Sequence, residues 1–170
     1  DKDDSDLDLH LIYVPNDHPT SPSAHFYFGT LDSTMNDFNL DPLKFRDERK
    51  YADRLKDARA KSGRRDAIVA AHGKVDGLET MAVVQDFAFM GGSLGMAAGE
   101  GIITAMFEAA DKRMPLVLYA ASGGARMHEG TVSLMQMAKT CAAIADVARP
   151  RLPYISILTN PTTGAVAPSL

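Results

Sequence analysis

Three times in its second half, this chain passes from a short apolar run into a small-residue loop that contains glycine. These segments are Gln85–Met96, Leu116–Met127 and Tyr154–Gly164. Apolar runs of this length are typical of buried strands, and the intervening stretches have the apolar spacing of helices. Strands and helices in this alternation pair the strands in parallel and bring the loops to one end of the sheet. The sequence therefore predicts a layered α/β fold with one site built from three loops.

The second loop turns at two adjacent glycines, Gly123 and Gly124. Glycine lets the backbone approach a ligand closely and adopt dihedral angles that a side chain forbids. Main-chain N–H groups presented at such a corner are what an oxyanion pocket requires. A plain tight turn is the alternative interpretation of a Gly-Gly pair. The two similar loops nearby favour the pocket, and with it chemistry that stabilises an enolate or a tetrahedral oxyanion.

Further motifs accompany the loops in a fixed order. They are Asp41–Asp47, Lys50–Leu55, His72–Leu78, Asp86–Met96, Ser122–Gly130, Leu134–Met137 and Thr159–Gly164. No single motif is diagnostic, but the ordered set closely resembles the carboxyltransferase β subunits of acetyl-CoA carboxylases of the bacterial and plastid type. The resemblance runs from Asp41 to Gly164.

The resemblance implies a crotonase-type, ClpP-like superhelix of β-β-α units, in which the β subunit pairs with an α subunit in an α2β2 assembly. It also implies transfer of a carboxyl group from carboxybiotin, held on a biotin carboxyl carrier protein, to acetyl-CoA. The product is malonyl-CoA, the precursor for fatty acid synthesis. The barrier lies in making a carbanion beside a thioester, so main-chain oxyanion pockets contribute more than side-chain acids or bases.

Carried onto this sequence, the resemblance places the catalytic pocket of the β subunit at Gly123 and Gly124. Arg126 and Glu129 are expected to support that loop. The residues expected to bind substrate come from all three loops: Gly91, Gly92, Ser93, Arg126, Thr162, Thr163 and Gly164. Ala165 stands where the family usually has a second glycine, so its methyl group is expected to narrow the third loop.

The chain divides near residue 41. Residues 1–40 begin with an acidic block and contain three prolines, so we expect a loosely ordered segment with one short strand at His25–Phe28. This segment shows no resemblance to the family and contains no cysteine, so neither the four-cysteine zinc ribbon of most such subunits nor zinc is expected. Residues 41–170 are expected to form a carboxyltransferase domain that lacks its C-terminal layer, which leaves apolar surface for a partner to cover.

Residues 47–60 are expected to form a helix that ends at Gly63, followed by a hairpin of strands 67–72 and 78–85. Helices are expected at 94–113 and 131–148, with a strand at 116–121 between them. The last helix should bury an apolar face, which makes its methionines core residues and its cysteine a buried thiol. That face comprises Leu134, Met135, Met137, Ala138, Cys141 and Ile144.

More than half of the Lys and Arg residues lie between positions 44 and 65. A solvated helix surface with ion pairs is the favoured interpretation, and contact with the phosphates of coenzyme A is the alternative. The net charge of −4 gives no signal for nucleic acid, and no apolar run is long enough for a membrane span. A cytoplasmic or stromal location is therefore expected.

Two rival functions remain open. Gly91–Gly95 matches the Gly-x-Ser-x-Gly elbow of serine hydrolases, which would make Ser93 a nucleophile, but His128 is the only later histidine and does not make a triad. The chain could instead be a non-catalytic structural fragment of this fold. Within the family, a propionyl-CoA carboxylase or malonate decarboxylase subunit is the nearest alternative.

Overall fold

A computed structural model describes residues 25–27, 41, 43–148, 151–164 and 166–170. The strands are β1 His25–Tyr27, β2 Ile68–Val75, β3 Leu78–Gln85, β4 Leu116–Ser122 and β5 Tyr154–Thr162. The α-helices are α2 Tyr51–Ser62, α3 Met96–Asp111, α4 Thr131–Ala148 and α5 Val166–Ser169. Two single-turn 3₁₀ helices lie in the loops, η2 at Met90–Gly92 and η3 at Met127–Glu129.

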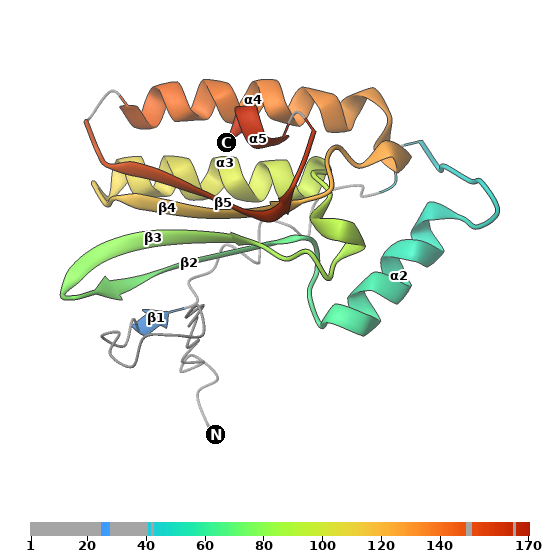
Figure 1. Cartoon of the computed structure of the whole chain (residues 1–170), viewed down its shortest axis with the longest axis horizontal. Helices are drawn as coiled ribbons and strands as arrows, with labels where there is room; N and C mark the ends of the chain where they lie inside the picture. The colour runs from blue at the N-terminus through green and yellow to red at the C-terminus, as the bar shows by residue number, and fades with distance from the viewer. Residues whose placement is uncertain (1–24, 28–40, 42, 149–150, 165) are drawn as a thin grey trace.

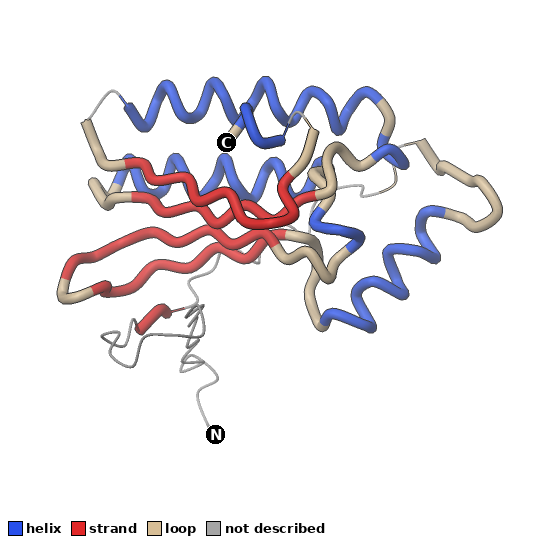
Figure 2. Tube along the Cα trace, in the orientation of Figure 1, coloured by secondary structure: helices blue, strands red, loops and turns tan. Residues whose placement is uncertain are grey.

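The strands form a five-stranded mixed sheet in the order β1-β2-β3-β4-β5 (Figure 2). The pairs β1–β2 and β2–β3 are antiparallel, whereas β3–β4 and β4–β5 are parallel. The predicted hairpin and the predicted parallel pairing are both confirmed. Because β3, β4 and β5 run the same way, the loops that follow them leave the sheet at the same end.

The two long helices lie on the same side of the sheet (Figure 1). Helix α3 packs against β2 and β3, and α4 packs along α3. The main core joins the buried face of β4, with Leu116 and Leu118, to Ile102 and Met106 of α3, all at most 1% exposed. Helix α2 lies beyond the end of the sheet from which these loops leave, and it contributes to a second, smaller core (Figure 1).

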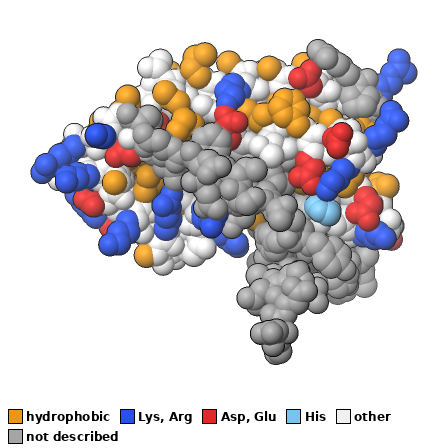
Figure 3. Space-filling model, turned by 180° about the vertical axis from the view of Figure 1, so that it is seen from behind, with side chains coloured by type: hydrophobic (Ala, Val, Ile, Leu, Met, Phe, Trp, Pro, Cys, Tyr) orange, Lys and Arg blue, Asp and Glu red, His pale blue; other side chains and the backbone are white. Residues whose placement is uncertain are grey.

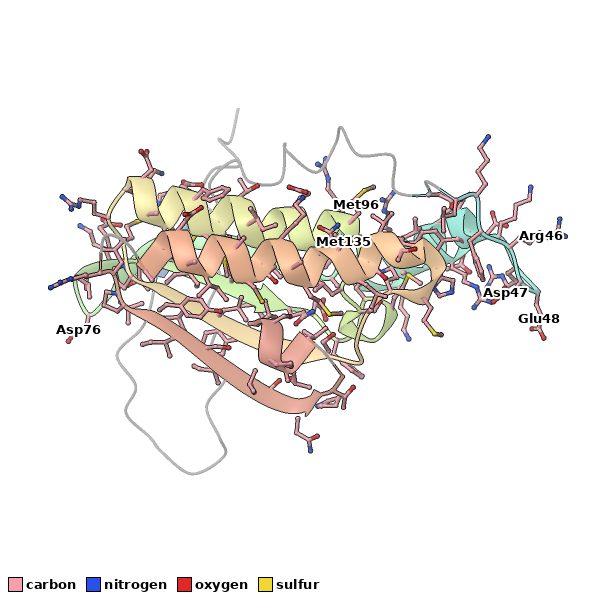
Figure 4. All side chains as sticks on the ribbon, turned by 90° about the horizontal axis from the view of Figure 1, so that it is seen from above. Arg46, Asp47, Glu48, Asp76, Met96 and Met135 are labelled. Atoms are coloured by element: carbon pink, nitrogen blue, oxygen red, sulfur yellow. The ribbon has the colours of Figure 1, made fainter. Side chains whose placement is uncertain are left out.

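The two ends of the molecule contain different parts of the chain. Asp76, in the β2–β3 turn, lies at one end, and the exposed segment Arg46–Glu48 before α2 lies at the other (Figure 4). The small core at the α2 end contains Tyr51 and Phe89, both fully buried. The loops after β3, β4 and β5 leave the sheet at this same end (Figure 1).

Several predicted boundaries are confirmed. The helix at 131–148 has the expected bounds, and Gly63 ends α2 in the left-handed conformation with φ 69°. Helix α2 begins at Tyr51 instead of 47, because the Asp47 carboxylate accepts the Arg49 N–H at 2.9 Å and forms a turn that competes with the helix. His25–Tyr27 is a strand, and Phe28 lies outside the described residues. Most of residues 1–40, which were expected to be loosely ordered, also lie outside the described residues. So does Ala165, which was expected to narrow the third loop.

The predicted buried face of α4 is wrong for most of its members. Leu134 and Met135 are 52% and 57% exposed, and Ala138 and Cys141 are exposed too, so Cys141 is not a buried thiol. The buried positions are small or polar: Ser133, Gln136, Met137, Thr140, Ala143 and Val147. Most of their polar groups have local partners, as when the Ser133 hydroxyl donates to the Gly130 carbonyl at 2.7 Å, although the buried Gln136 Oε1 has no hydrogen-bond partner among the described residues. The apolar spacing in the sequence therefore predicted burial for a face of α4 that is mostly exposed in the structure.

The contact between α3 and α4 requires Gly99. A methyl group at this position would lie 2.4 Å from Gln136 Oε1 and 2.8 Å from Gln136 Cβ. We expect Gly99→Ala to lower the free energy of unfolding by about 1–3 kcal/mol, because Gln136 cannot yield at its Cβ. Urea unfolding followed by circular dichroism measures the change.

A double-mutant cycle provides the control for this prediction. In a Gln136→Gly background the clashing Cβ, Cγ and Oε1 atoms are all absent, so the further cost of Gly99→Ala should shrink markedly. An equal cost in both backgrounds would contradict the proposed packing constraint.

Candidate active site

The three predicted loops meet beside the Gly-Gly corner. The Gly123 N–H donates to the Gly91 carbonyl at 2.8 Å, and the Leu94 N–H donates to the Gly124 carbonyl at 2.9 Å, so the first loop is bonded to the second. Gly164 of the third loop is equally close, since a Cβ built there would lie 3.7 Å from Gly124 Cα. The convergence expected from the repeated strand-loop pattern is confirmed.

The first loop requires glycine at Gly92. Met90, Gly91 and Gly92 all have positive φ, and a Cβ at Gly92 would lie 1.9 Å from the Ala121 carbonyl oxygen. The Gln85 side chain holds this turn by donating to the Gly92 carbonyl at 2.7 Å. The loop is thus pressed against the end of β4, and no side chain at position 92 would permit that approach.

The third loop is tied to β4 through its threonines. The Thr162 hydroxyl donates to the Ala120 carbonyl at 2.8 Å, and the Thr163 N–H donates to the Ser122 carbonyl at 2.8 Å. These bonds cross the irregular register between β4 and β5 near Ala120 and Ser122. Thr162 was predicted to bind substrate, but its hydroxyl proton is already directed at the backbone. This bond holds the end of β5 against β4, where Gly164 lies beside Gly124, and the substrate-binding role stays a prediction.

The Gly-Gly corner differs from the prediction in one respect. Both N–H groups that were expected to be free have internal acceptors, Gly123 at the Gly91 carbonyl and Gly124 at the Ser122 hydroxyl, 3.1 Å away. Gly124 has a φ of 122°, and a Cβ built on it would meet nothing within 4 Å. The corner therefore has an open side at Gly124, but its N–H groups are not directed freely into it.

A buried ion pair holds the corner from behind. Arg126 and Asp66 are each 1% exposed, and they form two hydrogen bonds of 2.8 and 2.7 Å. The guanidinium also donates to the Ser93 hydroxyl at 3.1 Å and to the Ser93 carbonyl at 2.7 Å. Although burial opposes its charge, the adjacent Asp66 raises the pKa of Arg126 above its ordinary value.

This burial corrects one predicted role. Arg126 was expected both to support the loop and to bind substrate. Only the supporting role fits a side chain that is buried and whose guanidinium donates hydrogen bonds to Asp66 and to the Ser93 carbonyl. Its guanidinium lies 5.4 Å from the ring centroid of Phe89, which covers another face. Arg126 therefore positions Ser93 and its own loop instead of contacting a ligand.

Glu129 is the second buried support. Its carboxylate is fully buried, accepts the Tyr51 hydroxyl at 2.6 Å and accepts the Met96 N–H at 2.5 Å. Helix α3 has no side-chain cap of its own, because its N-cap residue is Gly95. Glu129 takes this place from a distant loop, where the positive end of the helix dipole favours a carboxylate. Burial, together with the bond to Glu129, raises the pKa of Tyr51.

The hydrolase alternative finds no support in this geometry. Ser93 Oγ accepts a hydrogen bond from the Arg126 guanidinium, which cannot remove a proton. The His128 ring instead stacks on Tyr51 at a centroid distance of 5.1 Å and meets Phe45 edge-on at 5.4 Å. Burial, reinforced by Arg54, lowers the pKa of His128. Its observed role is to pack η3 against α2.

Two members of the support were missed at the sequence level, Tyr51 and Asp66. Tyr51 was placed only within the helix expected at residues 47–60, and its hydroxyl is what reaches Glu129. Asp66 follows two arginines and precedes a buried strand. An acidic residue directly before a buried strand could have indicated a buried ion pair. Its partner, Arg126, lies 60 positions away, so the sequence did not identify it.

The basic end of the molecule is formed largely by α2. Figure 3 shows Lys and Arg side chains gathered over this end. Some of them pair with carboxylates, as Arg49 does with Asp57 at 2.6 Å and Arg54 with Asp47 at 2.7 Å. The ion-paired surface expected for this helix is thus present, although neither pair has the i,i+4 spacing.

Within the ranges that the structure describes, no cluster of three or more His, Cys, Asp or Glu side chains is arranged to hold a metal ion. No helix among them has the length and apolar character needed to cross a bilayer.

Sequence comparison relates the chain to carboxyltransferases. The family described as carboxyl transferase domain matches residues 33–169, so the match begins inside the segment in which we found no resemblance. The chain is 62% identical over 135 residues to the acetyl-coenzyme A carboxylase carboxyl transferase subunit beta of Azorhizobium caulinodans, covering 79% of this chain and 46% of that protein. It is 59% identical over 172 residues to the subunit of the same name from a Methylobacterium species, covering 96% and 57%. The chain spans about half the length of these relatives.

Solved structures share the fold. One is transcarboxylase 12S with methylmalonyl-coenzyme A and methylmalonic acid bound, with a TM-score of 0.58 and 31% identity over 61% of this chain and 20% of that one. Another is the Pseudomonas malonate decarboxylase MdcD-MdcE heterodimer, with a TM-score of 0.56 and 30% identity over 61% and 48%. These likenesses confirm the crotonase-type α/β fold, of which this chain supplies part.

The buried ion pair generates a stability prediction. Asp66→Asn should lower the free energy of unfolding by about 3–5 kcal/mol, because it removes the carboxylate that forms both short hydrogen bonds to the buried Arg126 charge and leaves only Glu129, 3.5 Å away, as a counter-ion. Asp57→Asn is the matched control, since it breaks the Arg49 pair on the surface and should cost less than about 1 kcal/mol. Urea unfolding measures both, and similar costs for the two variants would contradict the central role of Asp66.

The position of His128 generates a pH prediction. An NMR titration of its ring should give a midpoint below the ordinary value of 6.5, because burial disfavours the charged form. The unfolded chain then binds more protons, so this contribution to stability is full above pH 6.5 and is lost as the pH falls through the folded-state pKa. His128→Phe, which keeps a ring on Tyr51, should remove that part of the pH dependence. A midpoint at or above 6.5 would refute the assignment.

Proposed function

This chain belongs to the carboxyl transferase domain family, and on that premise we propose that it forms the β-subunit side of an active site that carboxylates acetyl-CoA. The carboxyl group comes from carboxybiotin, and the product is malonyl-CoA. The observation that carries the proposal is the convergence of three glycine loops on the open side of Gly124. The identities of 62% and 59% to acetyl-CoA carboxylase β subunits support the choice of reaction.

The reaction needs donors for developing negative charge more than it needs a proton-transfer residue. Charge accumulates on the thioester oxygen when the acetyl group loses its proton, and on the ureido oxygen of biotin when CO2 departs. Backbone N–H groups held in place before the reaction stabilise such oxygens without reorganisation. In this proposal Gly123 and Gly124 form the pocket, Gly91, Gly92 and Ser93 form its neighbouring wall, and Thr162, Thr163 and Gly164 form the third side.

The proposal includes partners. A carboxyltransferase α subunit would supply the second oxyanion pocket in an α2β2 assembly, and a biotin carboxyl carrier protein would deliver carboxybiotin. Exposed apolar side chains on α4 and on the edge strand β5 support the need for a covering partner; Met135 and Leu158 are 57% and 54% exposed. The compartment, cytoplasm or plastid stroma, stays a prediction.

The fold by itself does not select the acyl group, because malonate decarboxylase and transcarboxylase 12S share the fold at 30% and 31% identity. The β subunits named for acetyl-CoA are about twice as similar in sequence, which favours acetyl-CoA over the related acyl-CoA carboxylases and malonate decarboxylases. The exposed cations at the α2 end are candidates for contact with the phosphates of coenzyme A.

One experiment tests the reaction against both rivals. The reverse half-reaction, transfer from malonyl-CoA to free biocytin, is measured with the chain alone and with a carboxyltransferase α subunit added. We expect turnover only with the α subunit. Transfer in neither case, with native circular dichroism, would favour the non-catalytic fragment, and labelling of Ser93 by a fluorophosphonate probe would favour the hydrolase.

The pocket assignment predicts the effect of filling the corner. Gly124→Val should lower carboxyl transfer by at least about 100-fold, because the side chain would occupy the open side where the substrate oxygen is proposed to bind. Since φ is 122° at Gly124, the variant also carries backbone strain of roughly 1–3 kcal/mol.

Gly63→Val is the matched control for this strain. Gly63 also has positive φ and nothing within 4 Å of a built Cβ, but it lies at the end of α2. It should lose comparable stability and keep its transfer rate. A Gly124→Val variant that is folded and active would overturn the assignment of the pocket.

A further inference from the structure

Ser122 is a buried serine at the last position of β4, and the mechanism outlined above gives it no role. Its side chain is fully buried. Its hydroxyl oxygen accepts the Gly124 N–H at 3.1 Å, and the hydroxyl also lies 3.4 Å from the Gly124 carbonyl oxygen. Ser122 therefore contacts both polar groups of the glycine that faces the open side of the corner.

The hydrogen bonds around this contact are made by the backbone. The Ser122 carbonyl accepts the Thr163 N–H at 2.8 Å, the Gly123 N–H donates to the Gly91 carbonyl at 2.8 Å, and the Gly124 carbonyl accepts the Leu94 N–H at 2.9 Å. Breaking any of these bonds would move one loop relative to another. The Gly124 N–H differs because its acceptor is a hydroxyl on a side chain, which a single χ1 rotation moves away.

Gly124 is buried as a residue, whereas Gly123 is exposed, but the corner leaves room beside the Gly124 α-carbon. A Cβ built there meets nothing within 4 Å, whereas one built on Gly92 would collide with the backbone of β4. A ligand oxygen that approaches Gly124 thus meets no side chain at the α-carbon. The remaining obstacle to a hydrogen bond is that the N–H already has an acceptor.

We propose that the Ser122 hydroxyl is an exchangeable internal acceptor, which holds the Gly124 N–H until the carbonyl oxygen of a substrate replaces it. This inference rests on the proposed carboxyl transfer and adds a positioning residue to its pocket. The ligand chemistry is a carbonyl oxygen that gains negative charge. Either the acyl thioester or the ureido group of biotin supplies such an oxygen.

The exchange favours the charged state of the substrate. A neutral carbonyl that replaces a hydroxyl trades one ordinary hydrogen bond for another, so it gains little. A hydrogen bond to an oxyanion is roughly twice as strong as one between neutral groups, so the developing charge gains more. An acceptor that must be displaced therefore weakens ground-state binding while the pocket stabilises the transition state.

The first test uses the chain alone and does not depend on its activity. Amide hydrogen exchange by NMR should be several-fold faster at Gly124 in Ser122→Ala than in the wild type, and unchanged at Gly123, whose acceptor is the Gly91 carbonyl. Unchanged protection at Gly124 would overturn the proposal. Should Ser122→Ala fail to fold, Ser122→Cys retains the volume with a weaker acceptor and should shift the same amide in the same direction.

The second test uses the chain assembled with a carboxyltransferase α subunit. Removing the competing acceptor should lower KM for one substrate by about fivefold in Ser122→Ala and leave kcat unchanged, because the ground state and the transition state gain equally. A lower KM for biocytin identifies the ureido oxygen, and a lower KM for malonyl-CoA identifies the thioester oxygen. A fall in kcat or a rise in KM is the mark of a merely structural serine and would overturn the proposal.

Ser169→Ala is the matched control. Ser169 is also buried, and its hydroxyl donates to the Val166 carbonyl within α5 at 2.9 Å. It should leave KM, kcat and the exchange of Gly124 unchanged. If the wild-type assembly shows no carboxyl transfer, the proposed function fails, but the exchange measurement still decides whether the Ser122 hydroxyl is the acceptor that protects the Gly124 N–H.

Discussion

The buried pair of Arg126 and Asp66 is the interaction on which the loop end of this molecule depends. It joins the segment before β2 to the loop after β4, and through Ser93 it also joins the loop after β3. Two charges removed from water carry a large desolvation penalty, which only well-aligned hydrogen bonds offset. The guanidinium has such bonds to Asp66 and Ser93, so any displacement of one loop would leave a charge uncompensated. The segment before β2 and the loops after β3 and β4 are therefore held in one arrangement.

Close backbone contact is the second constraint, and it follows from the first. The loops approach so nearly that a Cβ at Gly92 would lie 1.9 Å from the Ala121 carbonyl oxygen. Glu129 completes the arrangement by capping α3 from the loop after β4 while it accepts the Tyr51 hydroxyl. Side chains thus form the rear of the site, and the backbone forms its front. A front of this kind suits chemistry that stabilises an oxyanion, where fixed N–H donors matter more than acids and bases.

Much of the fold followed from local sequence patterns. The strands, the hairpin, the bounds of α4 and the glycine cap of α2 depend on neighbouring residues, and the structure confirms them. The face that α4 buries does not depend on neighbours alone. Its packing against α3 selects the small and polar positions near Gln136 and leaves Leu134 and Met135 outside, against the apolar pattern. Periodicity identifies a helix, but the shape of the opposing surface decides which side is buried.

The sequence by itself determined which residues meet at the site, because three strand-loop units with parallel strands bring their glycines to one end of a sheet. The tertiary structure alone decided what those residues do there. It placed Asp66 and Tyr51 behind the loops, buried the Arg126 side chain, and gave the N–H groups of Gly123 and Gly124 internal acceptors. The physical reason is that hydrogen-bond partners and burial depend on contacts between residues far apart in the chain, and no local pattern records those contacts.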